Sequence, residues 1–182
     1  KLGITRAGEA AMNAPEIFAV VAAVKEAYLS LENPDFTFVE KAVERRPYAR
    51  LLEQLALTFE LRETTDENED VAFICLVSGE DEDLGLWLSM AGPYALIQRV
   101  GEDHVETLCA PYSDAETELL AVLAEHHVAL VSEELLRHRI HMNLPKAAGG
   151  KATLYQALFD NSQALPWGVQ DWDEEQEGPA DV

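Results

Sequence analysis

The sequence predicts an α+β fold, in which an antiparallel meander of about five strands is preceded by helices and followed by a helical segment that packs on one face. Between residues 57 and 109, five short runs rich in β-branched and aromatic side chains are separated by acidic or Gly- and Pro-containing turns. Before and after them, apolar residues recur at intervals of three and four, the period of a helix. An uninterrupted series of strands favours hairpins over β-α-β alternation.

Two helical stretches come before the strands. Asn13 and Pro15 are typical of a helix start, so the first helix is expected over residues 15–31. Thr37-x-x-Glu40 fits a capping box at the start of the second stretch. Because Pro47 has no amide hydrogen, we expect this stretch to form two short helices that meet at Arg46.

The five strands are expected within residues 57–64, 71–77, 84–90, 94–100 and 104–109. In the third run, leucines alternate with Gly85, Trp87 and Ser89, which predicts one face on the core and a second face that is partly covered.

Further short elements follow the sheet. Ser113-x-x-Glu116 fits a capping box and predicts a helix. Residues 128–140 are then expected to form an extended piece and a short helix, residues 146–152 a flexible joint, and residues 153–161 a last short element.

The length suits a single α+β domain, which we place at residues 13–168. Residues 1–12 precede it and are expected to be a flexible N-terminus or a remnant of how the chain was produced. Residues 169–182 contain six acidic residues and no basic one, which predicts a disordered acidic tail.

The charge balance points to the kind of partner. Thirty-four Asp and Glu against thirteen Lys and Arg give a net charge of −21. This charge repels nucleic acids and anionic membranes and favours a basic protein partner. No apolar run approaches the ~18 residues of a membrane span. Cys75 and Cys109 are expected to be buried free thiols, which suits a cytoplasmic protein.

Candidate partner-binding residues lie in two acidic clusters that flank the second strand, and in the tail. They are Glu67, Glu69, Asp70, Glu80, Asp81, Glu82, Asp83 and Trp172. A Trp in an acidic segment is typical of a recognition anchor, whereas Trp167 is expected to dock on the domain. The alternative for the carboxylates is that they keep the turns soluble and prevent strands of different chains from pairing.

Motifs for chemistry are missing from the sequence. It contains no nucleophile elbow, phosphate-binding loop or dinucleotide fingerprint, so we predict no catalytic residue and no cofactor. A metal site remains an alternative, because the i, i+3 spacing of His138 and His141 would place both rings on one helix face, with Glu125 and His126 as further ligands. Basic residues at 41–50 and 137–139 are expected to pair with acids of the same chain.

These observations favour a non-enzymatic, cytosolic binding protein that recognises a basic protein. Small acidic inhibitors of nucleases and toxin-neutralising immunity proteins share this composition, and the likeness is one of composition only. The alternatives are an enzyme that uses a metal or carboxylates, and a scaffold or assembly subunit built on the apolar sheet and the Trp-bearing tail.

Overall fold

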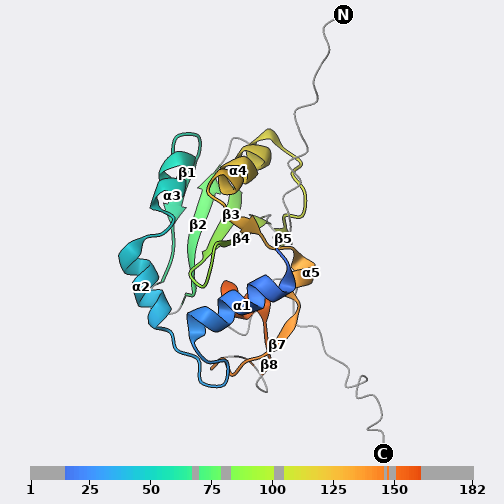
Figure 1. Ribbon diagram of the computed structural model, residues 1–182. Helices are drawn as coiled ribbons and strands as arrows, with labels where there is room; N and C mark the ends of the chain where they lie inside the picture. Colours follow the sequence, from blue (N-terminus) through green and yellow to red (C-terminus); the bar gives the residue numbers. More distant parts are fainter. Residues whose placement is uncertain are drawn as a thin grey trace, which may run out of the picture.

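The computed structural model describes residues 15–66, 70–78, 83–100, 105–145, 147 and 151–160 (Figure 1). The predicted meander is confirmed. Its strands are β1 (Glu60–Glu63), β2 (Ala72–Ser78), β3 (Asp83–Ser89), β4 (Tyr94–Val100) and β5 (Val105–Thr107). They lie side by side in chain order, and each pair is antiparallel. The predicted extended piece is β6 (Ala129–Leu130), which joins the sheet parallel to β4, a pairing that the sequence pattern did not indicate.

Helices cover one face of this sheet. The break at Arg46 is confirmed, because α2 (Thr37–Arg45) and α3 (Ala49–Leu55) are separated there and Arg46 has left-handed backbone angles. Tyr48, before α3, packs its ring edge-on against Phe73 of β2, with ring centroids 6.0 Å apart. The predicted helix after the sheet is α4 (Asp114–Glu125), which begins with the Ser113–Glu116 capping box as expected.

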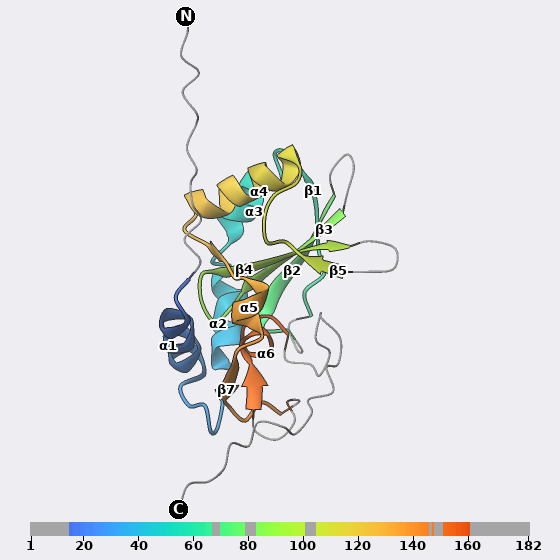
Figure 2. The ribbon, with the colours of Figure 1, turned by 90° about the vertical axis from the view of Figure 1, so that its right-hand side faces the viewer.

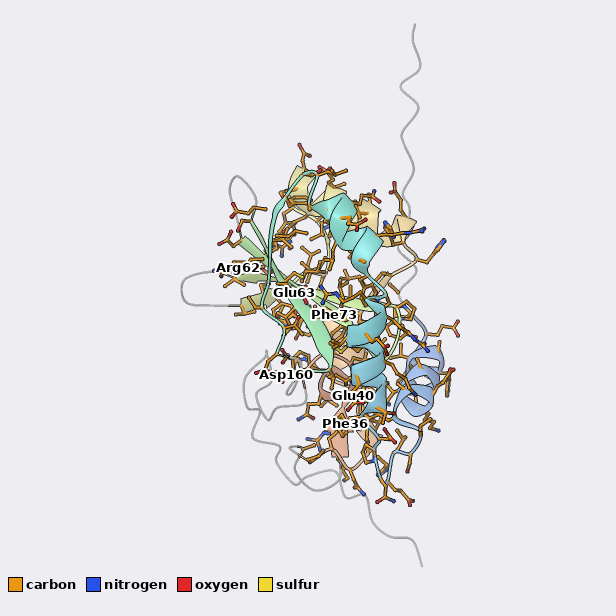
Figure 3. All side chains as sticks on the ribbon, turned by 90° about the vertical axis from the view of Figure 1, so that its left-hand side faces the viewer. Phe36, Glu40, Arg62, Glu63, Phe73 and Asp160 are labelled. Carbon is orange, nitrogen blue, oxygen red and sulfur yellow. The ribbon has the colours of Figure 1, made fainter. Side chains whose placement is uncertain are left out.

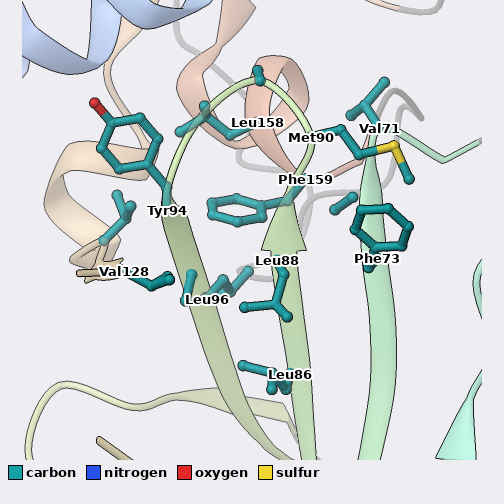
Figure 4. Packing of buried hydrophobic residues seen from close by; sticks show 14 of the residues in the cluster. Val71, Phe73, Leu86, Leu88, Met90, Tyr94, Leu96, Val128, Leu158 and Phe159 are labelled. Atoms are coloured by element: carbon teal, nitrogen blue, oxygen red, sulfur yellow. The ribbon is translucent and has the colours of Figure 1, made fainter. Parts of the chain in front are cut away.

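The remaining elements pack at one end of the sheet. They are α1 (Ile17–Tyr28), α5 (Glu133–Leu136), a hairpin of β7 (Arg139–His141) and β8 (Lys151–Thr153), and α6 (Leu154–Leu158). Tyr28 is fully buried, and its hydroxyl donates to the carbonyl of Ala157 at 2.9 Å, which ties α1 to α6. Figure 4 shows Leu158 and Phe159 beside Met90, where α6 meets the β3–β4 turn.

Four local expectations were wrong. The N-cap of α2 is Phe36, and the Asp35 carboxylate accepts a hydrogen bond from the Thr37 amide at 2.7 Å. The predicted capping box of Thr37 and Glu40 therefore does not form. The predicted joint at 146–152 ends in β8, which begins at Lys151. His141 lies in β7 and His138 precedes this strand, so they do not share a helix face. Cys75 is buried as expected, but Cys109 is exposed.

The helix and sheet boundaries differ slightly from those expected. Residue Ile17 begins α1 and Tyr28 ends it, because the next residue, Leu29, has a φ of 58° that the helix cannot continue. Asn13, the predicted cap, lies outside the described residues, as do residues 1–12 and 169–182, and also Trp167.

The outer face of the sheet is partly covered, as the alternation in the third strand predicts. Trp87 and its neighbours Ile74 and Leu76 on β2 are half-buried. The indole of Trp87 lies back along β3 over Gly85, where a Cβ atom would overlap its six-membered ring. Gly85 therefore makes room for the indole on this face.

We predict that Gly85→Ala lowers the free energy of unfolding by about 1–2 kcal/mol, because the added methyl displaces the indole. In a Trp87→Ala background the same substitution should be nearly neutral. Urea unfolding of the two single variants and the double variant measures this coupling. An equal effect of Gly85→Ala in both backgrounds would contradict the packing described.

Candidate interaction surface

Of the two acidic clusters that the sequence places around β2, the structure describes Asp70 and Asp83. Asp83 is the first residue of β3, at the end of the sheet where the β2–β3 turn lies. Asp70 precedes β2 at the opposite end, where its carboxylate accepts the Asp66 amide at 2.7 Å. The other candidates, Glu67, Glu69, Glu80, Asp81, Glu82 and Trp172, lie outside the described residues. Asp70 and Asp83, the described members of the two clusters, therefore lie at opposite ends of the sheet.

At the Asp83 end, several elements contribute to one surface. The strand register places Glu60 beside Ser78, Ser78 beside Asp83, and Val100 beside Val105. Figure 2 shows β1, β3, β5 and the start of α4 toward the same side of the molecule. We call this region the hairpin-end surface. Its described residues are Leu57, Glu60, Asp83, Val100, Val105, Glu106, Tyr112 and Glu118.

Contacts between elements hold this region together. The Thr58 hydroxyl, next to β1, donates to the Glu118 carboxylate of α4 at 2.9 Å. On the other side, the Arg99 guanidinium of β4 lies 3.4 Å from Glu106 of β5. The first turns of α4 thus contact both the segment before β1, through Glu118, and β4, through Glu116.

The hairpin-end surface combines exposed apolar side chains with carboxylates. Among the described residues, six large apolar side chains are exposed, and four of them belong to this surface, so they are concentrated at one end. These four are Leu57, Val100, Val105 and Tyr112. The sequence from Asp83 to Glu125 has eight acidic residues and a single Lys or Arg, Arg99. Side chains alternate between the two faces of a strand, so Val100 and Val105 lie on the face away from α4, whereas Tyr112, which stacks on Arg99, lies on the α4 side.

The single cation, Arg99, is used within the fold. Its Nε donates to one carboxylate oxygen of Glu116 at 2.5 Å and its Nη2 to the other at 3.0 Å. Nη2 also donates to the Ala110 carbonyl at 3.0 Å. The guanidinium stacks on the Tyr112 ring, with Cζ 4.2 Å from the ring centroid. Arg99 is therefore engaged within the fold, both with Glu116 and with Glu106 of the hairpin-end surface, 3.4 Å away.

Glu116 is fully buried and still ionised. Burial opposes its ionisation, but the hydrogen bonds from Arg99 and from the Tyr112 amide, together with the charge of Arg99, outweigh it, so the pKa of this carboxyl is lowered. The amides of Tyr112 and Ser113 donate to the same oxygen, at 2.5 and 3.3 Å. A buried carboxylate with this many donors is stable as an ion.

Sequence reasoning identified Glu116 only as part of a helix cap. The signal for its larger role was Arg99, the isolated cation in a long acidic stretch, because a buried carboxylate requires a partner of opposite charge. Tyr112 and the exposed valines were missed, since nothing in their own positions separates them from core residues.

The basic residues of the two predicted patches behave as expected where the structure shows their partners. Arg46 makes a two-pronged ion pair with Glu63, at 2.8 and 2.5 Å, and stacks on Phe73. Figure 3 labels Glu63 and Phe73. The hydrogen bonds from Arg46 lower the pKa of Glu63. Arg137 pairs with Glu133 one helical turn away, at 2.5 Å.

Two cavities lie elsewhere. One of about 340 Å³ is lined by residues that include Tyr48, Ser89 and His126. The Tyr48 hydroxyl is within 2.7 Å of the Ser89 and Gly92 carbonyls, so it holds the β3–β4 turn. The other, of about 380 Å³, includes Arg46, Glu63 and Cys75, whose thiol has a pKa raised by burial to about 11. At neutral pH this thiol is protonated and is a poor nucleophile.

The alternative metal ligands are not brought together. Glu125 and His126 are at the end of α4, where the Gln54 side chain forms a hydrogen bond with each of them. His138 precedes β7, and His141 is the last residue of that strand. Within residues 15–160, as far as the structure describes them, no group of three or more His, Cys, Asp or Glu side chains is placed to hold a metal ion.

Comparison with known proteins gives no match to a family model, to a curated protein or to a solved structure. Among the described helices, none combines the length and the apolar character needed to cross a membrane.

We predict that Glu116→Gln lowers the free energy of unfolding at neutral pH by about 2–4 kcal/mol, because it leaves the Arg99 charge buried with a weaker partner. Since the pKa of Glu116 is lower in the folded protein than in the unfolded chain, the pair stabilises the fold above the unfolded pKa of about 4.3, and this contribution is lost as the pH falls through the lowered value. The variant should therefore lose less stability on acidification.

Denaturant unfolding of wild type and Glu116→Gln between neutral and acidic pH measures both effects. Glu133→Gln is the control, since it removes a half-exposed ion pair and should change stability by less than about 1 kcal/mol. Parallel pH profiles for wild type and Glu116→Gln would contradict the assignment.

Proposed function

We propose that this protein is a non-enzymatic binding protein that recognises a basic protein through the hairpin-end surface. The observation that carries the proposal is the concentration of exposed apolar side chains among carboxylates at one end of the sheet. Apolar contacts would supply affinity, and the carboxylates would steer a positively charged partner into place.

The kind of partner follows from the charge. Proteins that bind nucleic acids carry basic surfaces for phosphate contacts, and an acidic surface of matching shape can occupy them. We therefore extend the proposal to an inhibitor or immunity-type protein that acts in the cytoplasm against a toxin or nuclease. The exposed apolar side chains distinguish this end of the sheet from one that is acidic only for solubility.

The proposal predicts where binding energy is lost. Glu60→Gln combined with Asp83→Asn should weaken binding of the partner roughly tenfold or more at low salt, because two rim charges contribute to the attraction. Glu26→Gln combined with Glu44→Gln is the matched control: it makes the same change in net charge on exposed residues of α1 and α2.

The measurement begins with wild-type protein as bait at low and high salt, and continues with the dissociation constants of the captured basic protein for both double variants. A loss confined to the hairpin-end variant, with binding that weakens as salt increases, supports the proposal. Equal losses in both variants would show that the attraction depends on net charge alone and would contradict it. If the partner is a nuclease or toxin, inhibition should follow the same order among the variants.

A further inference from the structure

The cavity of about 340 Å³ lies at the β3–β4 end of the sheet, and its size is within the range of sites that bind small molecules. Much of its lining is apolar and includes Met90 and Val128. The polar side chains in the lining are those of Tyr48, Ser89 and His126. The described residues around it include no Asp, Glu, Lys or Arg, so a charged ligand would find no partner of opposite charge there.

Hydrogen bonds hold the walls of this cavity in place. The Tyr48 hydroxyl lies 2.6 Å from the Ser89 carbonyl and 2.7 Å from the Gly92 carbonyl, so its single hydrogen is already used within the β3–β4 turn. The Ala129 amide of β6 donates to the Pro93 carbonyl at 2.9 Å and ties the segment after α4 to the same turn. The cavity is therefore formed before a ligand arrives, which reduces the ordering that binding requires.

The hydrogen bonds around His126 determine which of its ring nitrogens carries the hydrogen. A carboxylate only accepts, so the Gln54 side chain turns its NH₂ group toward Glu125, at 2.7 Å. The Gln54 carbonyl oxygen then faces Nε2 of His126, at 2.8 Å. Because this oxygen also only accepts, Nε2 carries the hydrogen, and Nδ1 of the neutral ring has a lone pair.

This lone pair is unused in the described part of the chain, where Nδ1 has no hydrogen-bond partner. Gln54 does not line the cavity, so Nδ1 is the polar atom of the His126 ring that is left for a ligand. The Ser89 hydroxyl already accepts the Ala91 amide at 3.2 Å. An acceptor without a partner beside an apolar lining favours a ligand that brings a single donor.

We propose that this cavity binds a small neutral molecule that has an apolar body and one hydroxyl or N–H group, and that this group donates to Nδ1 of His126. The apolar body would pack on Met90 and Val128. Gln54 is a positioning residue, because its bond to Glu125 fixes the ring hydrogen of His126 on Nε2. The site is independent of the hairpin-end surface, which lies at the other end of the sheet.

The test uses phenol, which has a hydroxyl group, and toluene, which has nearly the same shape but no donor. Each is titrated into the full chain at mildly alkaline pH, and nuclear magnetic resonance follows the Met90 methyl signal. Met142, which is buried elsewhere in the core, is the internal reference. A saturable shift of Met90 alone places the small molecule in the cavity, with dissociation constants in roughly the millimolar range because both molecules are small.

The His126→Leu variant tests the acceptor. It should lower the ratio of phenol affinity to toluene affinity roughly tenfold, because it removes the acceptor and keeps a side chain of similar size. The matched control is His138→Leu, the same substitution at an exposed histidine outside the cavity, which should leave the ratio unchanged. The ratio is used because a change in the shape of the cavity affects both molecules alike.

The positioning role of Gln54 has its own readout. Nuclear magnetic resonance of the imidazole nitrogens distinguishes a nitrogen that carries a hydrogen from one that has a lone pair. Wild type should carry the hydrogen on Nε2 of His126, and Gln54→Leu should increase the share of rings that carry it on Nδ1 and lower the phenol-to-toluene ratio. An unchanged hydrogen position or an unchanged ratio in this variant would overturn the positioning role.

The remaining outcomes decide the site itself. If neither molecule shifts the Met90 methyl signal, the cavity is not a binding site. If the affinity ratio is the same in wild type and His126→Leu, or if the wild-type ring carries its hydrogen on Nδ1, His126 is not the acceptor. Any of these results overturns the inference and leaves the basic-partner proposal standing, since that proposal is tested with charge variants at the hairpin end.

Discussion

The ion pair between Arg99 and Glu116 is the interaction that joins the two halves of this fold. Arg99 comes from a central strand and Glu116 from the first turn of the helix that covers it. Burying two charges is unfavourable unless their hydrogen bonds are satisfied, and here the carboxylate receives donors from the guanidinium and from two backbone amides. The same carboxylate therefore caps α4, fixes the connection from β5 and neutralises Arg99. The position of the helix on the sheet and the shape of the hairpin-end surface both follow from it.

The topology makes the two ends of the sheet different. In an antiparallel meander, successive turns alternate between the ends, so the β2–β3 and β4–β5 turns share one end and the β3–β4 turn lies at the other. At the β3–β4 end, α6 and Phe159 pack against the turn and α1 closes the core behind them. At the opposite end, the described elements leave Val100 and Val105 about half exposed. Among the described residues, no helix covers these two side chains.

The sequence predicts the parts of this structure that depend on neighbouring residues, and it fails where distant residues decide. The five strands, the break before Pro47 and the Ser113 cap each rest on a local pattern and are confirmed. The parallel pairing of β6 with β4 joins residues more than thirty positions apart, and no local pattern encodes it. Asp70 and Asp83 flank the same strand in sequence, and this strand of seven residues spans about 23 Å, so they lie at opposite ends of it. Cys109 was predicted to be buried because it follows an apolar run, but the buried part of this run ends at Leu108, and Cys109 is exposed.

Solubility alone does not account for the distribution of side chains at the hairpin end. Carboxylates placed for solubility would accompany a polar surface, yet Leu57 and Tyr112 are exposed at the same end of the sheet as Glu60 and Asp83. Protection of sheet edges explains Glu60, which lies on an edge strand, but not Asp83, which begins a central strand with a neighbour on each side. Nor does either reason require an exposed tyrosine that rests on a buried ion pair. We propose recognition of a basic protein as the reason for these features, because binding a cationic surface uses negative charge, apolar contact and side chains that are ordered before binding.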